Sequence, residues 1–120
     1  MVDGELRLTY RQFFDRCDRW SAVLQGLGVA PSDHVATIAR NTHAQLESFY
    51  AVPQIGAVLV PINYRLTPED FVYIVNHSGA TVLCAHSEPT CSSRIRRNTS
   101  AGSTLRRQTC TPAAVVTVQV

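Results

Sequence analysis

The chain has 120 residues, with eleven arginines, nine acidic residues and no lysine. This length limits it to one small domain. The missing lysine excludes P-loop NTPases with the G-x-x-x-x-G-K-[ST] motif and Schiff-base enzymes, because both chemistries require a lysine amine. Two-component receiver domains, which are also small α/β folds and normally carry a functional lysine, are excluded for the same reason.

Charge divides the chain into two parts. Residues 1–88 hold six arginines and all nine acids, a net charge of −3, whereas residues 89–120 hold five arginines and no acid, a net charge of +5. The second part also lacks aromatic residues and is rich in serine and threonine. We therefore expect a folded domain over residues 1–88, followed by a basic tail over residues 89–120 that is disordered or frameshifted.

The sequence predicts neither a targeting segment nor a membrane span. Its first residues are acidic and polar, unlike a secretory signal, and its longest apolar run, residues 56–60, has the length of a strand. We therefore expect a cytoplasmic protein whose four cysteines are reduced thiols.

The first predicted helix begins after Thr9. The Thr9 side chain can cap the helix, and Gln12 lies at the spacing that completes a capping box. Gly26 and Gly28 predict where the helix ends. Apolar and small residues at spacings of three and four predict one buried stripe: Tyr10, Phe13, Phe14, Cys17, Ser21, Leu24 and Leu27.

Asp3-Gly4 predicts a hairpin turn upstream of this helix, with residues 5–8 as its second strand. Only two residues precede the turn. We therefore expect the partner strand to be missing, as in a chain that starts inside a larger architecture.

Two further helix–strand pairs follow a predicted strand at residues 34–39. Asn41 or Thr42 caps the second helix, in which Pro53 predicts a kink or an early end. The predicted buried face of this helix is Leu46, Phe49, Tyr50 and Pro53. After Gly56, residues 57–60 form a continuous apolar run that is typical of a buried parallel strand.

The third predicted helix repeats the starting pattern of the first. Thr67 caps it, Pro68 occupies its first position and Gly79 ends it, while Ile74 and Val75 continue its buried face. A strand at residues 81–85 follows. The alternation of helix and strand predicts an α/β fold, with a three- or four-stranded, mostly parallel piece of a doubly wound sheet.

Several short segments, in order and without gaps over residues 3 to about 88, resemble the start of AMP-forming acyl-CoA synthetases, which are adenylate-forming enzymes. They are LTYRQF at 8–13, LQGLGV at 24–29, DHVA at 33–36, Asn41, GAVLVPINYRLTPE at 56–69 and SGA at 78–80. Fatty-acid ligases are the most similar group, because VPQIG at 52–56 is typical of a bacterial subset.

The resemblance implies a two-step ligase reaction. A carboxylate attacks ATP, with magnesium shielding the phosphates, to give acyl-adenylate and pyrophosphate, and the thiol of coenzyme A then takes the acyl group. The family's phosphate loop ending in Pro-Lys-Gly, its Tyr-Gly-x-Thr-Glu adenine motif, its ribose-binding aspartate, its hinge and its C-terminal lysine are absent here. We therefore carry over no catalytic, cofactor-binding or metal-binding residue, and expect no cofactor for this chain. A smaller departure is Ser32, where the family usually has glycine.

The tail allows two functional readings, neither of which we adopt. Its arginines could neutralise phosphates of a nucleic acid, but no aromatic residue is present for base stacking, so we do not favour nucleic-acid binding. These arginines are Arg94, Arg96, Arg97, Arg106 and Arg107. Cys84, His86, Cys91 and Cys110 could be drawn as a metal site, but they lack the paired spacing of structural zinc sites. After Glu88, the resemblance to the synthetases, the acidic residues and the aromatic residues all stop together, which favours a frameshift.

We therefore expect a truncated acid–CoA ligase that is inactive by itself. The alternative is a non-catalytic module that associates with a larger synthetase or other chains through an exposed sheet edge. A basic-tailed nucleic-acid binder is the remaining alternative.

Overall fold

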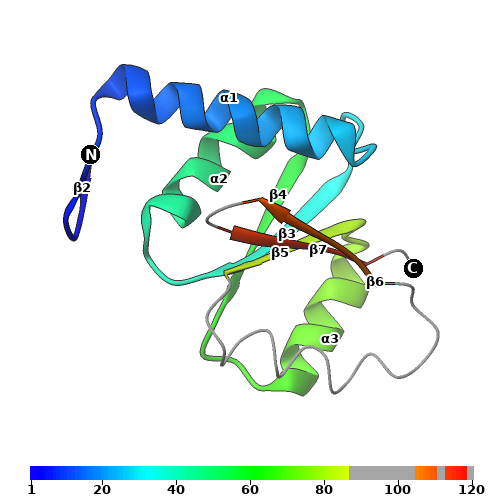
Figure 1. Cartoon of the computed structure of the whole chain (residues 1–120). Helices are drawn as coiled ribbons and strands as arrows, with labels where there is room; N and C mark the ends of the chain where they lie inside the picture. Colours follow the sequence, from blue (N-terminus) through cyan, green and yellow to red (C-terminus); the bar gives the residue numbers. More distant parts are fainter. Residues whose placement is uncertain (87–104, 111–112, 119–120) are drawn as a thin grey trace.

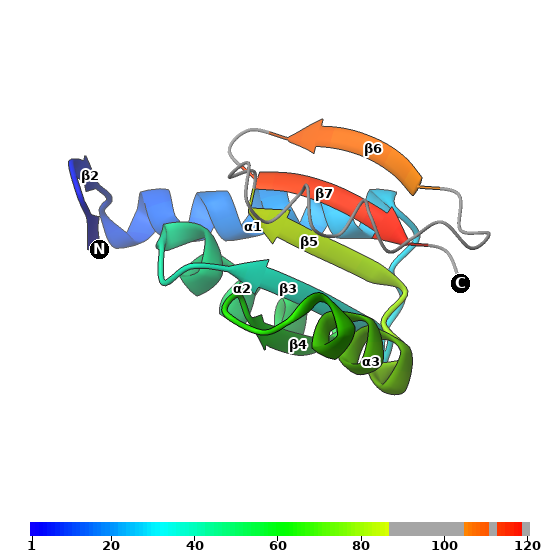
Figure 2. The same cartoon turned by 90° about the horizontal axis from the view of Figure 1, so that it is seen from below.

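The computed structural model describes residues 1–86, 105–110 and 113–118. A sheet forms its middle layer (Figure 1). Two helices, α1 (Tyr10–Gly26) and α2 (His43–Gln54), cover one face of the sheet, and α3 (Pro68–Ser78) covers the other. The turned view in Figure 2 shows the same three layers, with α3 in front of the sheet and α1 behind it.

Three parallel strands make up the predicted part of the sheet. They are β3 (His34–Ala39), β4 (Val58–Asn63) and β5 (Val82–His86), and β3 lies between the other two. Each is joined to the next through a helix, so the α/β prediction with parallel strands is confirmed. The two helical layers bury separate apolar clusters, because alternate residues of β3 face opposite sides of the sheet.

Two more strands extend the sheet within the segment predicted to be a disordered tail. The antiparallel pair β6 (Leu105–Cys110) and β7 (Ala113–Val118) continues the sheet, with β7 antiparallel to β5. The β-branched run in β7 suits a strand, and β5 offers it a free edge. The expectation of a disordered or frameshifted tail over residues 89–120 stays a prediction. The remainder of the tail, including Cys91 and Arg94, lies outside the described residues.

Helix α1 begins as predicted. The Thr9 hydroxyl accepts a hydrogen bond from the Gln12 amide, and the Gln12 side chain accepts one from the Thr9 amide. The predicted stripe is only partly buried: Phe13, Cys17, Ser21 and Leu24 are buried, whereas Tyr10 and Phe14 are exposed. Phe14 is exposed at the rim of the α1–α2 contact, where its ring meets the Tyr50 ring of α2 edge to face.

The predicted buried face of α2 is wrong. Leu46, Phe49, Tyr50 and Pro53 are exposed. The helix instead buries a face of smaller or polar residues, namely Ala44, Glu47, Ser48, Ala51 and Val52. The physical reason is close packing against α1, since the Ser21 hydroxyl donates to the Ala51 carbonyl at 2.9 Å. Helix α2 ends at Gln54, one residue after Pro53, as the proline predicts.

Strand β4 is parallel as predicted, but it is not fully buried. It lies at the edge of the sheet beside β3 alone, and Val58 at its start is exposed. The edge position accommodates Pro61, which has no N–H group to donate to a second neighbour. The turn that leads into this strand is tight: Gly56 has a φ of 75°, and a Cβ there would lie 3.3 Å from Pro31 Cβ.

Helix α3 follows the sequence prediction at both ends. The Thr67 hydroxyl accepts from the Asp70 amide and the Asp70 carboxylate accepts from the Thr67 amide, which completes a capping box. Gly79 ends the helix in the left-handed conformation. Ile74 and Val75 pack on the cluster around Phe71, as expected.

The strand that was expected to be missing upstream of α1 is present. Strand β1 (Val2–Asp3) pairs with β2 (Leu6–Arg7) in a short antiparallel hairpin, because the Asp3-Gly4 turn needs only two residues on each side. The hairpin lies at one end of the molecule, beside the start of α1 (Figure 2). Within the described part of the chain, no helix is long and apolar enough to cross a membrane.

Candidate functional site

A cationic surface lies at the carboxyl ends of β3 and β4. Register pairs Ala39 with Asn63, so the residues that follow the two strands emerge at the same edge of the sheet. In open α/β sheets, ligands bind at this edge. Arg40 follows β3 directly, and Tyr64 and Arg65 follow β4.

The Tyr64 ring lies near both guanidinium groups. The Cζ atoms of Arg40 and Arg65 lie 5.7 Å and 5.5 Å from the centre of the Tyr64 ring, within the range of cation–π contact. Arg65 Nε also donates to the Tyr64 hydroxyl at 3.0 Å, and its backbone N–H donates to Asn63 Oδ1 at 3.0 Å. These contacts hold two positive charges near one partly buried ring.

This arrangement suits recognition of a phosphate-bearing ligand. Guanidinium groups match the geometry of phosphate oxygens, and both arginines are exposed to solvent. No site residue is predicted from the sequence, so these three residues were not expected to form a surface. The signal was available: an arginine follows one predicted parallel strand, and a Tyr-Arg pair comes shortly after the next.

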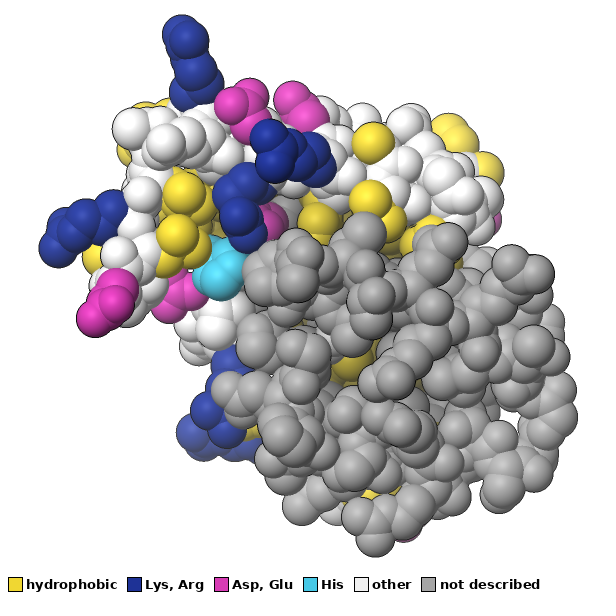
Figure 3. Space-filling view, in the orientation of Figure 1, with side chains coloured by type: hydrophobic (Ala, Val, Ile, Leu, Met, Phe, Trp, Pro, Cys, Tyr) yellow, Lys and Arg dark blue, Asp and Glu magenta, His cyan; other side chains and the backbone are white. Residues whose placement is uncertain are grey.

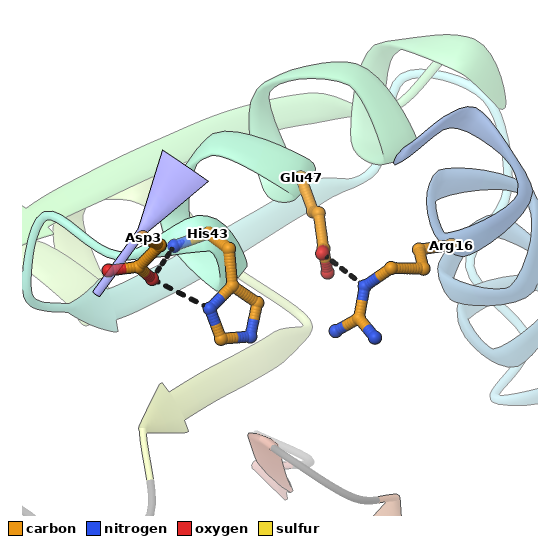
Figure 4. A network of polar contacts seen from close by, with 4 residues as sticks. All are labelled: Asp3, Arg16, His43 and Glu47. Carbon is orange, nitrogen blue, oxygen red and sulfur yellow. Dashed lines mark hydrogen bonds and ion pairs between the residues drawn. The ribbon is translucent and has the colours of Figure 1, made fainter. Parts of the chain in front are cut away.

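Two polar pairs on α2 have structural roles (Figure 4). Arg16 Nε of α1 donates to the Glu47 carboxylate at 2.5 Å, which joins the two helices. Asp3 Oδ2 accepts from the backbone N–H of His43 at 2.7 Å and lies 2.7 Å from His43 Nδ1. The hairpin thus supplies the cap of α2, because the hydroxyl of the N-cap residue Thr42 makes no capping bond.

The two cysteines whose side chains the structure describes, Cys17 and Cys84, are buried free thiols. Burial raises the pKa of the Cys84 thiol to about 12. Burial, and next the nearby Glu47 carboxylate, raises the pKa of the Cys17 thiol to about 11. Of the four residues considered above as a metal site, Cys91 and the side chains of His86 and Cys110 lie outside the described part of the structure. The side chains that are described form no cluster suited to a metal ion.

Comparison with known proteins identifies the family. Residues 1–118 match the sequence model of the family described as AMP-binding enzyme. The 4-hydroxybutyrate–CoA ligase 2 of Metallosphaera sedula is 44% identical over 80 residues, which cover 67% of this chain and 15% of that ligase. The long-chain-fatty-acid–CoA ligase of Thermus thermophilus is 43% identical over 81 residues, again 67% of this chain and 15% of that protein.

Solved structures agree with the sequence relatives. The fatty acyl CoA synthetase of Mycobacterium tuberculosis superposes with a TM-score of 0.71 at 33% identity, over 78% of this chain and 19% of that one. The anthranilate CoA ligase AuaEII gives a TM-score of 0.74 at 26% identity, over 78% of this chain and 18% of that one. The chain thus spans under one fifth of the length of these proteins. It belongs to the family of AMP-binding enzymes.

Proposed function

We propose that this chain forms the N-terminal part of the AMP-binding domain of an acid–CoA ligase, which joins a carboxylic acid to coenzyme A with cleavage of ATP to AMP and pyrophosphate. The observation that carries the proposal is the ordered family match. Three relatives above 40% identity are named as CoA ligases, for 4-hydroxybutyrate, long-chain fatty acids and trans-cinnamate. The proposed substrate is a fatty acid, and the proposed location is the cytoplasm.

We propose further that the 120 residues do not catalyse this reaction by themselves. The resembled enzymes hold the phosphates of ATP with a loop that ends in Pro-Lys-Gly, and this chain contains no lysine. The magnesium ion implied by the family does not fit the described side chains, because they offer no acidic cluster. The contribution of residues 1–86 is therefore scaffold and binding surface.

Within that scaffold, the Arg40–Tyr64–Arg65 surface contacts a phosphate group of a substrate. Both ATP and coenzyme A carry phosphates, and the surface lies at the carboxyl edge of the parallel strands. Contact with the Tyr64 ring already restricts both arginine side chains, so they lose less conformational entropy when a phosphate binds.

A chimaera tests the proposal. The 80 matching residues of the Metallosphaera sedula ligase are replaced by those of this chain, and acyl-CoA formation is measured. We expect an active chimaera, and no acid-dependent ATP–pyrophosphate exchange from the isolated 120 residues. Changing Arg40 and Arg65 together to methionine in the chimaera should raise KM for ATP or for coenzyme A by about tenfold or more, or about 1.4 kcal/mol.

Arg19→Met, on the exposed side of α1, is the matched control and should leave both KM values unchanged. A folded but inactive chimaera would overturn the scaffold proposal. Unchanged KM values in the double variant would overturn the assignment of the cationic surface alone.

An interaction module is the second candidate, because α1 and α2 share an exposed aromatic surface, defined here as Phe14, Phe49 and Tyr50. Phe49 and Tyr50 are 49% and 47% exposed, and the Phe14 and Tyr50 rings meet edge to face at 5.7 Å. Figure 3 shows hydrophobic side chains at the surface among the charged groups. Exposed apolar side chains that gather on one surface can mark a site where a partner binds.

The partner that we propose is the remainder of the AMP-binding domain, since the chain covers 19% of the fatty acyl CoA synthetase and 18% of the anthranilate CoA ligase described above. The test is co-purification of this chain with the Metallosphaera sedula ligase from which the matching 80 residues are deleted. Phe49→Ser should abolish the association, whereas Tyr73→Ser, on the exposed side of α3, should not. Equal association of both variants would contradict this candidate.

A further inference from the structure

Two residues at the interface of β3 and α2 carry a buried polar atom without a hydrogen-bond partner. In the described part of the chain, Thr37 Oγ1 of β3 and Gln45 Oε1 of α2 are both in this state. Thr37 is only 2% exposed and lies on the central strand of the sheet. A buried hydroxyl or amide oxygen without a partner is costly, so native proteins satisfy such groups with protein atoms or ordered water.

Both residues line the same small cavity. Its volume is about 10 Å³, about the space that one water molecule needs. The cavity is bounded by Trp20, Thr37, Ala39, Ala44, Gln45, Ser48, Cys84 and Ala85. Ser48 provides a third polar group, because its hydroxyl hydrogen is already donated to the Gln45 carbonyl at 2.7 Å and its oxygen can still accept.

We propose that this cavity is a hydration site that binds a single long-lived water molecule. The water accepts a hydrogen bond from the Thr37 hydroxyl and donates its two hydrogens to Gln45 Oε1 and Ser48 Oγ. Three bonds are the usual number for a buried water, and every group in the set then has a partner. The site connects β3 with the first turns of α2, and so fixes both ends of the loop that carries Arg40.

Water–protein cross-relaxation in NMR spectra of the complete chain tests the proposal. In the wild type, we expect cross-peaks between water and the methyl groups of Thr37 and Ala44, with the sign that a nanosecond or longer residence gives. Thr37→Val keeps the side-chain shape but removes the hydroxyl, so the cross-peak between water and the Ala44 methyl group should disappear. Thr37→Ser keeps the hydroxyl and should retain the water at Ala44.

Thr42→Val is the matched control. The Thr42 hydroxyl is also buried without a partner, but Thr42 lines a different hollow, between the hairpin and α2, which Gln45 also borders, and it does not line the cavity beside Thr37. The Thr42 variant should keep the cross-peaks. Magnetic relaxation dispersion of the water signal should likewise lose the contribution of one long-lived water in Thr37→Val and none in Thr42→Val.

Three results would overturn the proposal: no cross-peaks in the wild type, cross-peaks that persist in Thr37→Val, or a slowly exchanging Thr37 hydroxyl proton in direct contact with the Gln45 amide. If Thr37→Val does not fold, Gln45→Leu provides the second test, since it removes another partner from a partly exposed helix position. Loss of the cross-peaks in that variant supports the site, and their persistence contradicts it.

Discussion

The ion pair between Arg16 and Glu47 joins α1 to α2 through a buried carboxylate. The Glu47 side chain is 2% exposed and that of Arg16 is 29% exposed, so the carboxylate depends on the guanidinium for compensation of its charge. Arg16→Met keeps most of the aliphatic stem of the side chain and removes the charge. The variant therefore leaves a buried carboxylate without its cation.

The magnitude follows from this burial. Removing one partner of a buried ion pair destabilises a protein by about 3–5 kcal/mol. Arg16 is partly exposed and water can reach Glu47 in the variant, so we expect the lower end, about 3 kcal/mol. With an m-value of about 1.5 kcal/mol/M, the urea midpoint falls by about 2 M.

Urea unfolding followed by circular dichroism measures this loss. Arg19→Met, on the exposed side of the same helix, is the control and should stay within about 0.5 kcal/mol of the wild type. The double variant Arg16→Met with Glu47→Leu should recover most of the loss, because no buried charge remains. If Arg16→Met behaves like Arg19→Met, or if the double variant recovers nothing, the ion pair does not stabilise the contact between α1 and α2 as argued.

Three further predictions concern the backbone, a helix cap and a thiol. Ser32 and Gly56 both have a left-handed backbone, with φ of 72° and 75°. Ser32→Gly should therefore raise the free energy of unfolding by about 0.5–1 kcal/mol, whereas Gly56→Ala should lower it by about 1–2 kcal/mol. The same urea assay measures both changes, and changes of the same sign would contradict the argument from backbone strain. Thr67→Ala should lower the stability of the fold by about 1 kcal/mol, because the Thr67 hydroxyl caps α3. Thr42→Ala should lower it by less, because the Thr42 hydroxyl makes no capping bond. Equal losses of stability in thermal melts would refute this difference. Burial raises the pKa of the Cys84 thiol from an ordinary 9.0 to about 12, so the stability that the buried neutral thiol contributes is complete below pH 9 and falls as the pH rises toward 12, by about 1.4 kcal/mol per pH unit. Urea unfolding between pH 8 and 11 should therefore show a smaller loss of stability for Cys84→Ala than for the wild type. Identical pH profiles would exclude a buried thiol.

The sequence alone determined the elements whose cause is local. Thr9 and Thr67 start helices through bonds to residues three positions later, and Gly79 ends a helix through its own backbone conformation. Such signals lie within one turn of chain, so no knowledge of distant residues is needed. The alternation of three helices with strands then led to the correct α/β class with parallel strands.

Only the tertiary structure decided which faces are buried and which residues meet. The sequence pattern of α2 favours its aromatic side for burial, yet α1 packs on the side with Ala51 because small residues let the two helices approach closely. A partner for Glu47 lies 31 residues away in the chain, and Arg40 meets Tyr64 only because β3 and β4 are parallel neighbours. Burial and pairing depend on the order of strands and the packing of helices. Those contacts join residues far apart in the chain, and no local pattern encodes them.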